Sequence, residues 1–190
     1  MKKKFALSKK LGTTALIVFL LIIFVFVTGF NPLKNKCKDK HVDDNIDHVM
    51  AYFNAIDNED ADAIASLFSD DAVQEFVGND PIVGSDAIAQ QLNLAFAQMD
   101  TMQTQVLDVI AGEDMVAVHV RHVATFAAGG AIKSRVGIFP PIIIFKEPTP
   151  ITWQAMVTFK CADGKIIKEI IVRDDLSILM QVGTVSIETP

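Results

Sequence analysis

The sequence is poor in cysteine, in polar aromatic residues and, beyond residue 40, in basic side chains. Its 190 residues include two cysteines, one tyrosine and one tryptophan. Cys37 and Cys161 cannot form a disulfide framework, and their separation does not fit a zinc site. The four histidines have no recognised ligand spacing. The sequence therefore predicts neither a disulfide-stapled fold nor a metal centre.

Positive charge is concentrated at the N-terminus. Residues 1–40 hold nine of the 17 lysines and arginines, which leaves 8 basic against 22 acidic side chains in residues 41–190. The formal charge of this second part is −14. An acidic surface of this strength repels phosphate backbones, so we expect no nucleic-acid partner.

A long apolar run follows the first lysines. Residues 11–30 contain no charged side chain, and twenty helical residues rise roughly 30 Å, the thickness of a bilayer core. We interpret residues 1–10 as a basic tail, 11–30 as a transmembrane anchor or uncleaved signal, and 31–41 as a polar linker. The domain is then expected on the extracytoplasmic side of the membrane. Cleavage near residues 27–29, followed by secretion, is the alternative.

Hydrophobic periodicity in the rest of the chain predicts helices first and strands afterwards. Apolar residues recur at three and four positions in helices predicted over residues 42–57, 60–68 and 85–99. Alternation by two predicts a short strand over residues 72–77 and longer strands over 103–111, 115–126, 149–160 and 165–173. Residues 127–147 are expected to be irregular. This order predicts an α+β domain in which three helices cover one face of a curved antiparallel sheet.

A carboxylate stands at the end of the last predicted strand. Asp163-Gly164 is a strong hairpin signal, because glycine accepts the positive φ that a tight turn requires. The β-branched strand that follows ends at Asp174-Asp175. A carboxylate at the end of an apolar strand is costly unless solvent, a partner or a pocket receives it. We take Asp174 as the centre of the functional hypothesis. The alternative is a carboxylate in a turn or helix cap, since Asp175 and Ser177 follow it.

Several segments, taken in order, resemble one known superfamily. They are Tyr52-Phe53-Asn54-Ala55-Ile56-Asp57, Leu67-Phe68-Ser69-Asp70-Asp71-Ala72, Gly84-Ser85-Asp86-Ala87-Ile88, Asp163-Gly164-Lys165-Ile166 and Gln181-Val182-Gly183. This pattern resembles the SnoaL-like and ketosteroid-isomerase-like superfamily, which shares the cone-shaped fold of nuclear transport factor 2. The resemblance covers residues 42–183 and leaves residues 184–190 as a tail.

The resemblance implies an apolar pocket and chemistry without a metal or cofactor. In family enzymes a carboxylate removes a proton next to a carbonyl, and hydrogen-bond donors hold the enolate. By this likeness Asp174 is the acid/base group and Tyr52 the polarising donor. The isomerases' general base falls near Phe76 and their second acid near Ala155, so both groups are missing here.

Other candidates come from the strand patterns. His119 and His122 lie on opposite faces of one predicted strand, and either is a candidate pocket acid or base. We select His119 as the third catalytic candidate. The predicted pocket wall consists of Trp153, Met156, Phe76 and Phe96.

Two functions remain open at this point. The first is a membrane-anchored pocket protein that binds a small apolar ligand and carries out proton transfer or cyclisation at a carbonyl. The second is a non-catalytic ligand-binding or assembly domain that pairs through its sheet as a homodimer. The apolar stretch 136–145 is interpreted as a pocket lid, a dimer contact or a membrane-touching surface.

Overall fold

The structure is a computed structural model that describes residues 40–133 and 142–183. The predicted anchor (11–30), most of the linker, the tail (184–190) and part of the apolar stretch lie outside these residues. Within the two described ranges, no helix is long and apolar enough to span a bilayer. Membrane anchoring therefore stays a prediction from the sequence.

Three helices precede most of the sheet, as the periodicity predicted. They are α2 (Lys40–Asp57), α3 (Ala61–Leu67) and α4 (Ser85–Phe96). The Asp60 side chain accepts a hydrogen bond from the Ala63 backbone N–H at 2.9 Å, which satisfies a free donor in the first turn of α3. On α2, Val49, Phe53 and Ile56 are buried at helical spacing and face the sheet.

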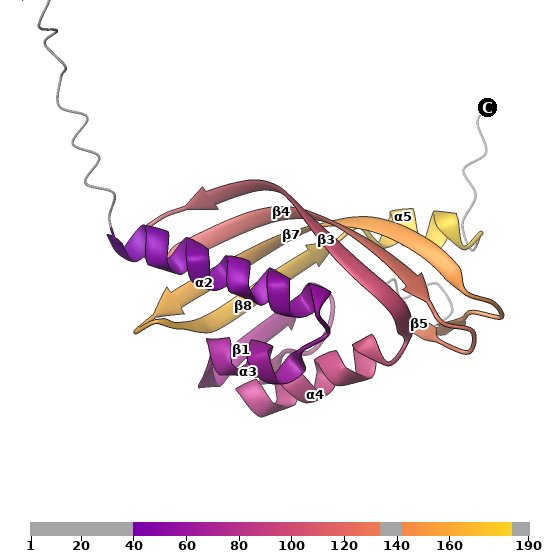
Figure 1. Cartoon of the computed structure of the whole chain (residues 1–190), viewed down its shortest axis with the longest axis horizontal. Coiled ribbons are helices and arrows are strands. Elements are labelled where there is room, and N and C mark those ends of the chain that lie inside the picture. The colour runs from indigo at the N-terminus through magenta and orange to yellow at the C-terminus, as the bar shows by residue number, and fades with distance from the viewer. Residues whose placement is uncertain (1–39, 134–141, 184–190) are drawn as a thin grey trace, which may run out of the picture. The chain divides into compact units, whose positions relative to one another are not determined.

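The main sheet has six strands. They are β1 (Phe68–Phe76), β2 (Ile82–Val83), β3 (Met99–Ala111), β4 (Met115–Phe126), β7 (Thr149–Ala162) and β8 (Lys165–Arg173). Their order across the sheet is β2-β1-β8-β7-β4-β3. In Figure 1, α2, α3 and α4 lie on one side of the curved sheet, as the sequence predicted.

The prediction of a wholly antiparallel sheet is wrong, because β1 pairs with β8 in parallel. Parallel partners need a long connection, and here the connection contains α4 and every other strand. The start predicted for the short strand, residue 72 directly after Asp70 and Asp71, is also wrong. The strand begins at Phe68 and runs through both acids, although its register with β8 shifts between Phe68 and Val73. This irregularity takes the residues between Phe68 and Val73 out of the regular ladder with β8.

Residues 127–147 are less irregular than expected. They contain a two-stranded hairpin of β5 (Ala131–Lys133) and β6 (Ile142–Ile144). Gly130 precedes this hairpin, and a Cβ atom there would lie 2.5 Å from the backbone oxygen of Gln98. Only glycine allows the chain to pass so close to the end of α4.

Two apolar clusters fill the space between the helices and the sheet. The larger one joins α2, α3 and α4 to the inner faces of β4, β7 and β8. The smaller one contains Phe126, Phe145, Trp153 and Ile178, and lies under the β5–β6 hairpin and the C-terminal helix α5 (Asp175–Gln181). The Phe126 and Phe145 rings stack with centroids 4.8 Å apart. The candidate site lies where these two clusters meet.

Candidate functional site

A cavity of about 280 Å³ opens between the inner face of the sheet and the helices α2 and α4. Residues of β5 and α5 also line it. Its wall is mostly apolar and includes four of the seven predicted site residues: Tyr52, Phe76, Phe96 and Trp153. A cavity of this size and character suits a small organic ligand.

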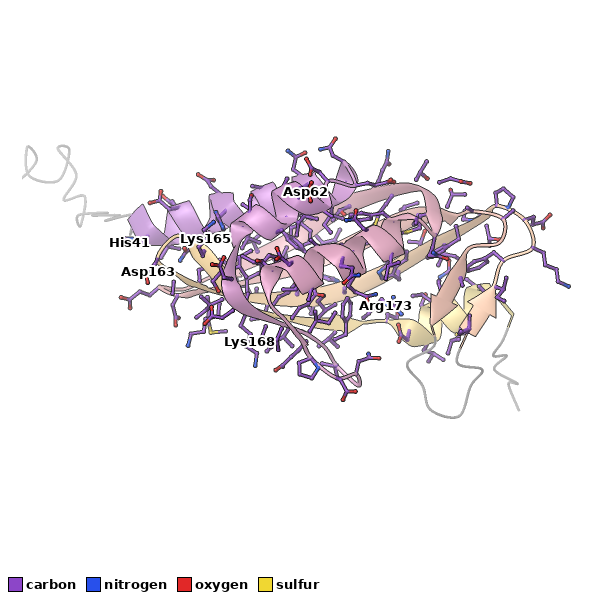
Figure 2. All side chains as sticks on the ribbon, turned by 90° about the horizontal axis from the view of Figure 1, so that it is seen from below. His41, Asp62, Asp163, Lys165, Lys168 and Arg173 are labelled. Carbon is purple, nitrogen blue, oxygen red and sulfur yellow. The ribbon has the colours of Figure 1, made fainter. Side chains whose placement is uncertain are left out.

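Polar side chains gather at two places on this wall. Tyr52, Gln74 and Glu169 line the cavity where α2, β1 and β8 meet, and His122 and Arg173 line it nearer α5. Arg173 is the last residue of β8, and Figure 2 shows it at the α5 end of this strand, away from Lys165 and Lys168. The pairing of the strands explains both positions.

A bulge in β8 turns Glu169 toward the cavity. Lys160 pairs with Lys168 and Cys161 pairs with Ile166, so Ile167 has no partner on β7. The extra residue reverses the inward and outward alternation of the strand. From there Glu169, Ile171 and Arg173 share the inner face, and each of them lines the cavity.

Glu169 is fully buried, and its carboxyl group interacts with the side chains of Gln74 and Tyr52. The Gln74 amide donates a hydrogen bond to Glu169 Oε2 at 2.7 Å, because β1 and β8 place these two residues side by side. Within the described residues, the Oε1 atom of Glu169 has no hydrogen-bond partner. Burial raises the pKa of Glu169 to about 7, although Gln74 and Tyr52 oppose part of that rise.

Tyr52 is held from α2 by aromatic contacts. Its ring packs edge-on against Phe53 and Phe159, with centroids 5.1 Å away in both cases. Burial and the neighbouring Glu169 carboxyl raise the pKa of Tyr52 well above its usual value. The hydroxyl therefore keeps its proton at neutral pH and can act as a hydrogen-bond donor.

At the other polar place, His122 lies between Thr104 and Trp153. Thr104 Oγ1 is 3.0 Å from His122 Nδ1, and the Trp153 ring centroid is 5.2 Å from that of the imidazole. Burial lowers the pKa of His122 to about 4, and the charge of Arg173 adds to this effect. The imidazole is therefore neutral at physiological pH. The Arg173 guanidinium pairs through Nε with Asp175.

Asp174 does not line the cavity, and of its two predicted roles the structure shows the helix cap. Asp174 is exposed, and it caps α5 by accepting a hydrogen bond from the Ser177 backbone N–H at 3.0 Å. It borders a shallow surface depression beside Leu176 and Met180. An aspartate is a favoured N-cap, and because Arg173 faces inward, alternation would turn Asp174 away from the cavity even if β8 continued.

His119 and Met156 lie on the outer face of the sheet and do not line the cavity. His119 Nε2 is 2.7 Å from Gln154 Oε1, and Met156 is 43% exposed. His119 pairs with Met156 across β4 and β7, so the two share one face. Alternation explains the error, because Trp153 and Ala155 face inward and the residue between Ala155 and Val157 must face outward.

Sequence reasoning did not single out Glu169, Gln74 or Arg173. Alternation on β1 gives a signal for Gln74, since it lies between the inward-facing Ala72 and Phe76. For Glu169 the signal is alternation by two counted from the C-terminal end of the strand, because Arg173, Ile171 and Glu169 then fall on one face. Counting forward from the Asp163-Gly164 turn gives the wrong face, because of the bulge at Ile167. Within the described residues, no cluster of His, Cys, Asp or Glu could hold a metal ion.

The fold and the family can now be compared with known proteins. Residues 49–169 match the SnoaL-like domain family. No protein with a curated description matches the sequence. Many solved structures share the fold, and three of them illustrate its range.

AclR, a proposed hydroxylase from Streptomyces galilaeus, is 19% identical to this chain with a TM-score of 0.61. The alignment covers 76% of this chain and 99% of AclR. A proposed SnoaL-like polyketide cyclase from Jannaschia Sp. CCS1 is 15% identical with a TM-score of 0.62, over 77% and 96% of the two chains. TerC, co-crystallised with polyporic acid, is 15% identical with a TM-score of 0.56, over 74% and 98%.

At these identities the structures demonstrate a shared fold and leave the chemistry to the residues of this chain. The family match itself spans more than half of the sequence. The chain therefore belongs to the SnoaL-like domain family.

Proposed function

We infer that this protein binds a small, largely apolar carbonyl compound in its cavity and moves a proton on it, with Glu169 as the acid/base group. The observation that carries this proposal is the burial of Glu169 on the cavity wall, where no described residue forms a hydrogen bond with its Oε1 atom. Buried carboxyls in clefts are often functional, because burial brings their pKa into the working range of acid/base catalysis.

The pKa of Glu169 suits both directions of proton transfer. At about 7, the group is present as acid and as carboxylate at physiological pH. Gln74 holds Oε2, which leaves Oε1 to receive the proton. Gln74 is thus a positioning residue for the carboxyl group.

The reaction is proton abstraction next to a carbonyl. The Glu169 carboxylate takes the proton, the C–H electron pair becomes the carbon–carbon double bond of an enolate, and the carbonyl π pair moves to oxygen. Tyr52 shares the cavity and remains protonated, so it is the donor for that oxygen. Return of the proton to a conjugated carbon gives isomerisation, and attack of the enolate carbon on a second carbonyl gives cyclisation.

The family likeness is one support for this reaction class. The related structures include a proposed polyketide cyclase and a protein that holds polyporic acid. The predicted acid/base role of Asp174 is weakened by its exposure and its position as a helix cap. His119 is likewise separated from the cavity by the sheet, so neither residue enters the proposed reaction.

Self-association is the second candidate function, and the outer face of the sheet favours it. Met156 and Val172 pair across β7 and β8 on this face and are 43% and 52% exposed. Val123 of β4 is also exposed on it, at 45%. Adjacent exposed apolar residues commonly mark a protein interface. We propose that two copies pair through this face.

We also propose that residues 11–30 hold the protein in a membrane, with the domain on the extracytoplasmic side. The support is the length and lack of charge of this run in the sequence. Release after cleavage of a signal peptide is the alternative outcome.

The first prediction concerns stability and pH. Between pH 4.5 and about 7, folded Glu169 retains a proton that the unfolded chain has released, so its contribution to stability falls as pH rises. His122 acts in the opposite direction, because below pH 6.5 the unfolded chain takes up a proton that the folded chain accepts only near pH 4. From pH 4.5 to 6.5 the two contributions largely cancel.

Single variants should separate the pH dependence due to Glu169 from that due to His122, when the free energy of unfolding is measured in urea from pH 4 to 8. As pH rises from 4.5 to 7, the free energy of unfolding of Glu169→Gln should increase relative to that of wild type by on the order of 3 kcal/mol. Relative to wild type, His122→Gln should gain stability as pH falls from 6.5 to 4. Glu75→Gln, on the outer face of β1, is the matched control. Parallel pH curves for Glu169→Gln and wild type would contradict the buried acid.

The second prediction tests the chemistry before the substrate is known. Wild-type protein in D₂O should accelerate α-proton exchange in a panel of aryl ketones and cyclic enones, followed by proton NMR. Glu169→Gln should lose this acceleration by roughly 10²- to 10⁴-fold, the usual contribution of a general base. Asp174→Asn should retain it. Loss in Asp174→Asn alone would replace Glu169 by Asp174 in the proposal.

The third prediction concerns self-association. Met156→Lys should shift sedimentation from dimer to monomer, because it places a charge in the centre of the proposed contact. Val83→Lys is the control, since Val83 is 61% exposed on β2 at the far edge of the sheet. A monomeric wild type, or an unchanged Met156→Lys dimer, would reject pairing through this face.

The fourth prediction concerns the N-terminal segment. The full chain should remain with membranes after alkaline carbonate extraction, and a protease added outside wall-stripped cells should digest its domain. N-terminal sequencing distinguishes an intact anchor from a cleaved signal. Recovery of the intact chain in the soluble fraction would disprove anchoring.

A further inference from the structure

The polar groups of the cavity are divided between two ends. Glu169 and Arg173 both face inward on β8 and lie four residues apart, roughly 13 Å between Cα atoms at about 3.3 Å per residue. Ile171 lies between them, and the neighbouring positions on β7 are Val157 and Ala155. The wall is therefore apolar in the middle and polar at both ends.

The second end carries the cavity's positive charge. Among the described residues that line the cavity, Arg173 is the only lysine or arginine. Its side chain is 17% exposed, and its Nε atom pairs with Asp175, whose side chain is 16% exposed. A guanidinium has five N–H donors, and this pairing uses only the Nε edge. Within the described residues, the structure gives the two Nη groups no hydrogen-bond partner.

The groups around Arg173 fit an anion better than a cation or a neutral group. Arg173 pairs with Ala155 of β7. The next inward-facing residue of β7 is Trp153, which pairs with His122 of β4. The imidazole of His122 is neutral at physiological pH, and Thr104 Oγ1 lies at its Nδ1 atom. The Trp153 ring supplies a flat apolar surface beside them.

We propose that the Arg173 end of the cavity is an anion-binding subsite that recognises a carboxylate or ionised phenol on the ligand. The ligand is then an elongated, mostly apolar molecule with its reactive carbonyl near Glu169 and an acidic group near Arg173. Arginine suits this role, because its planar fork can bind both oxygens of a carboxylate. This inference rests on the proposed function, since it names the substrate class for the same cavity.

The charge of Asp175 does not prevent this role. An arginine that shares one edge with a carboxylate can still present its other edge to a second. Asp175 is in the first turn of α5, where a carboxylate is stabilised by the helix dipole. It therefore fixes the guanidinium at the end of β8, with the Nη edge left for the ligand.

The test compares acids with neutral analogues of the same shape. The probes are benzoate, phenylacetate, 3-phenylpropanoate and 4-phenylbutanoate, each paired with its primary amide, titrated into the full chain by calorimetry. Wild type should prefer at least one carboxylate to its amide by roughly 10- to 100-fold, the usual effect of a charge-assisted hydrogen bond. No preference for any carboxylate would overturn the proposal.

Variants assign the preference to Arg173. Arg173→Gln should abolish this preference, whereas Arg173→Lys should retain part of it. Arg173→Gln/Asp175→Asn removes both charges, so the result does not depend on an unpaired Asp175. Lys168→Gln is the matched control, because it removes a positive charge from the outer face of the same strand, where Lys168 pairs with Glu75 at 2.9 Å. Undiminished preference in the double variant would reject the subsite.

Glu169→Gln separates this inference from the proposed function. It should remove α-proton exchange with neutral ketones and preserve the preference for carboxylates. Lys168→Gln, on the outer face of β8, should change neither. Carboxylate preference without any exchange activity would retain the subsite and reject the chemistry. Exchange activity without carboxylate preference would retain the chemistry and reject the subsite.

Discussion

The hydrogen bond between Gln74 and Glu169 is the constraint around which the site is built. It exists because β1 runs parallel to β8 in a register that places the two residues side by side. A buried carboxyl is tolerated only where a partner compensates it or where it holds a proton. Here Gln74 binds one oxygen, and burial raises the pKa of Glu169 to about 7. The same burial therefore limits stability and prepares the residue for proton transfer.

The strand that carries Glu169 also organises the rest of the cavity. Its inner face presents a carboxyl, an isoleucine and a guanidinium in succession, and its outer face carries exposed residues such as Val172. Because β8 is rigidly paired on both sides, the distance between the two polar ends is set by the backbone. A ligand must match that spacing, so selectivity would arise from the sheet.

The sequence predicted the helices, the long strands and the apolar wall, because each of these depends on local periodicity. Phe96 and Trp153 were identified in this way. The parallel pairing of β1 with β8 depends on a contact between distant segments, which no local pattern encodes. Glu169 was missed for a different reason. It follows Lys168 in a charged stretch that resembles a solvated face, and the bulge at Ile167 reverses the alternation that would have identified it.

The residues that resemble the family's C-terminal motif have a structural task in this chain. Strand β7 extends beyond the end of β8, so its backbone needs other partners there. The Asp174 N–H donates to Gln154 O at 3.0 Å, and the Gln181 side chain binds the N–H and the carbonyl of Thr152 at 2.9 and 2.6 Å. These bonds fix α5 against β7, and α5 in turn places Ile178 on the cavity wall. Asp174 and Gln181 thus shape the cavity from outside, and the polar chemistry lies further back along β8, at Glu169 and Arg173.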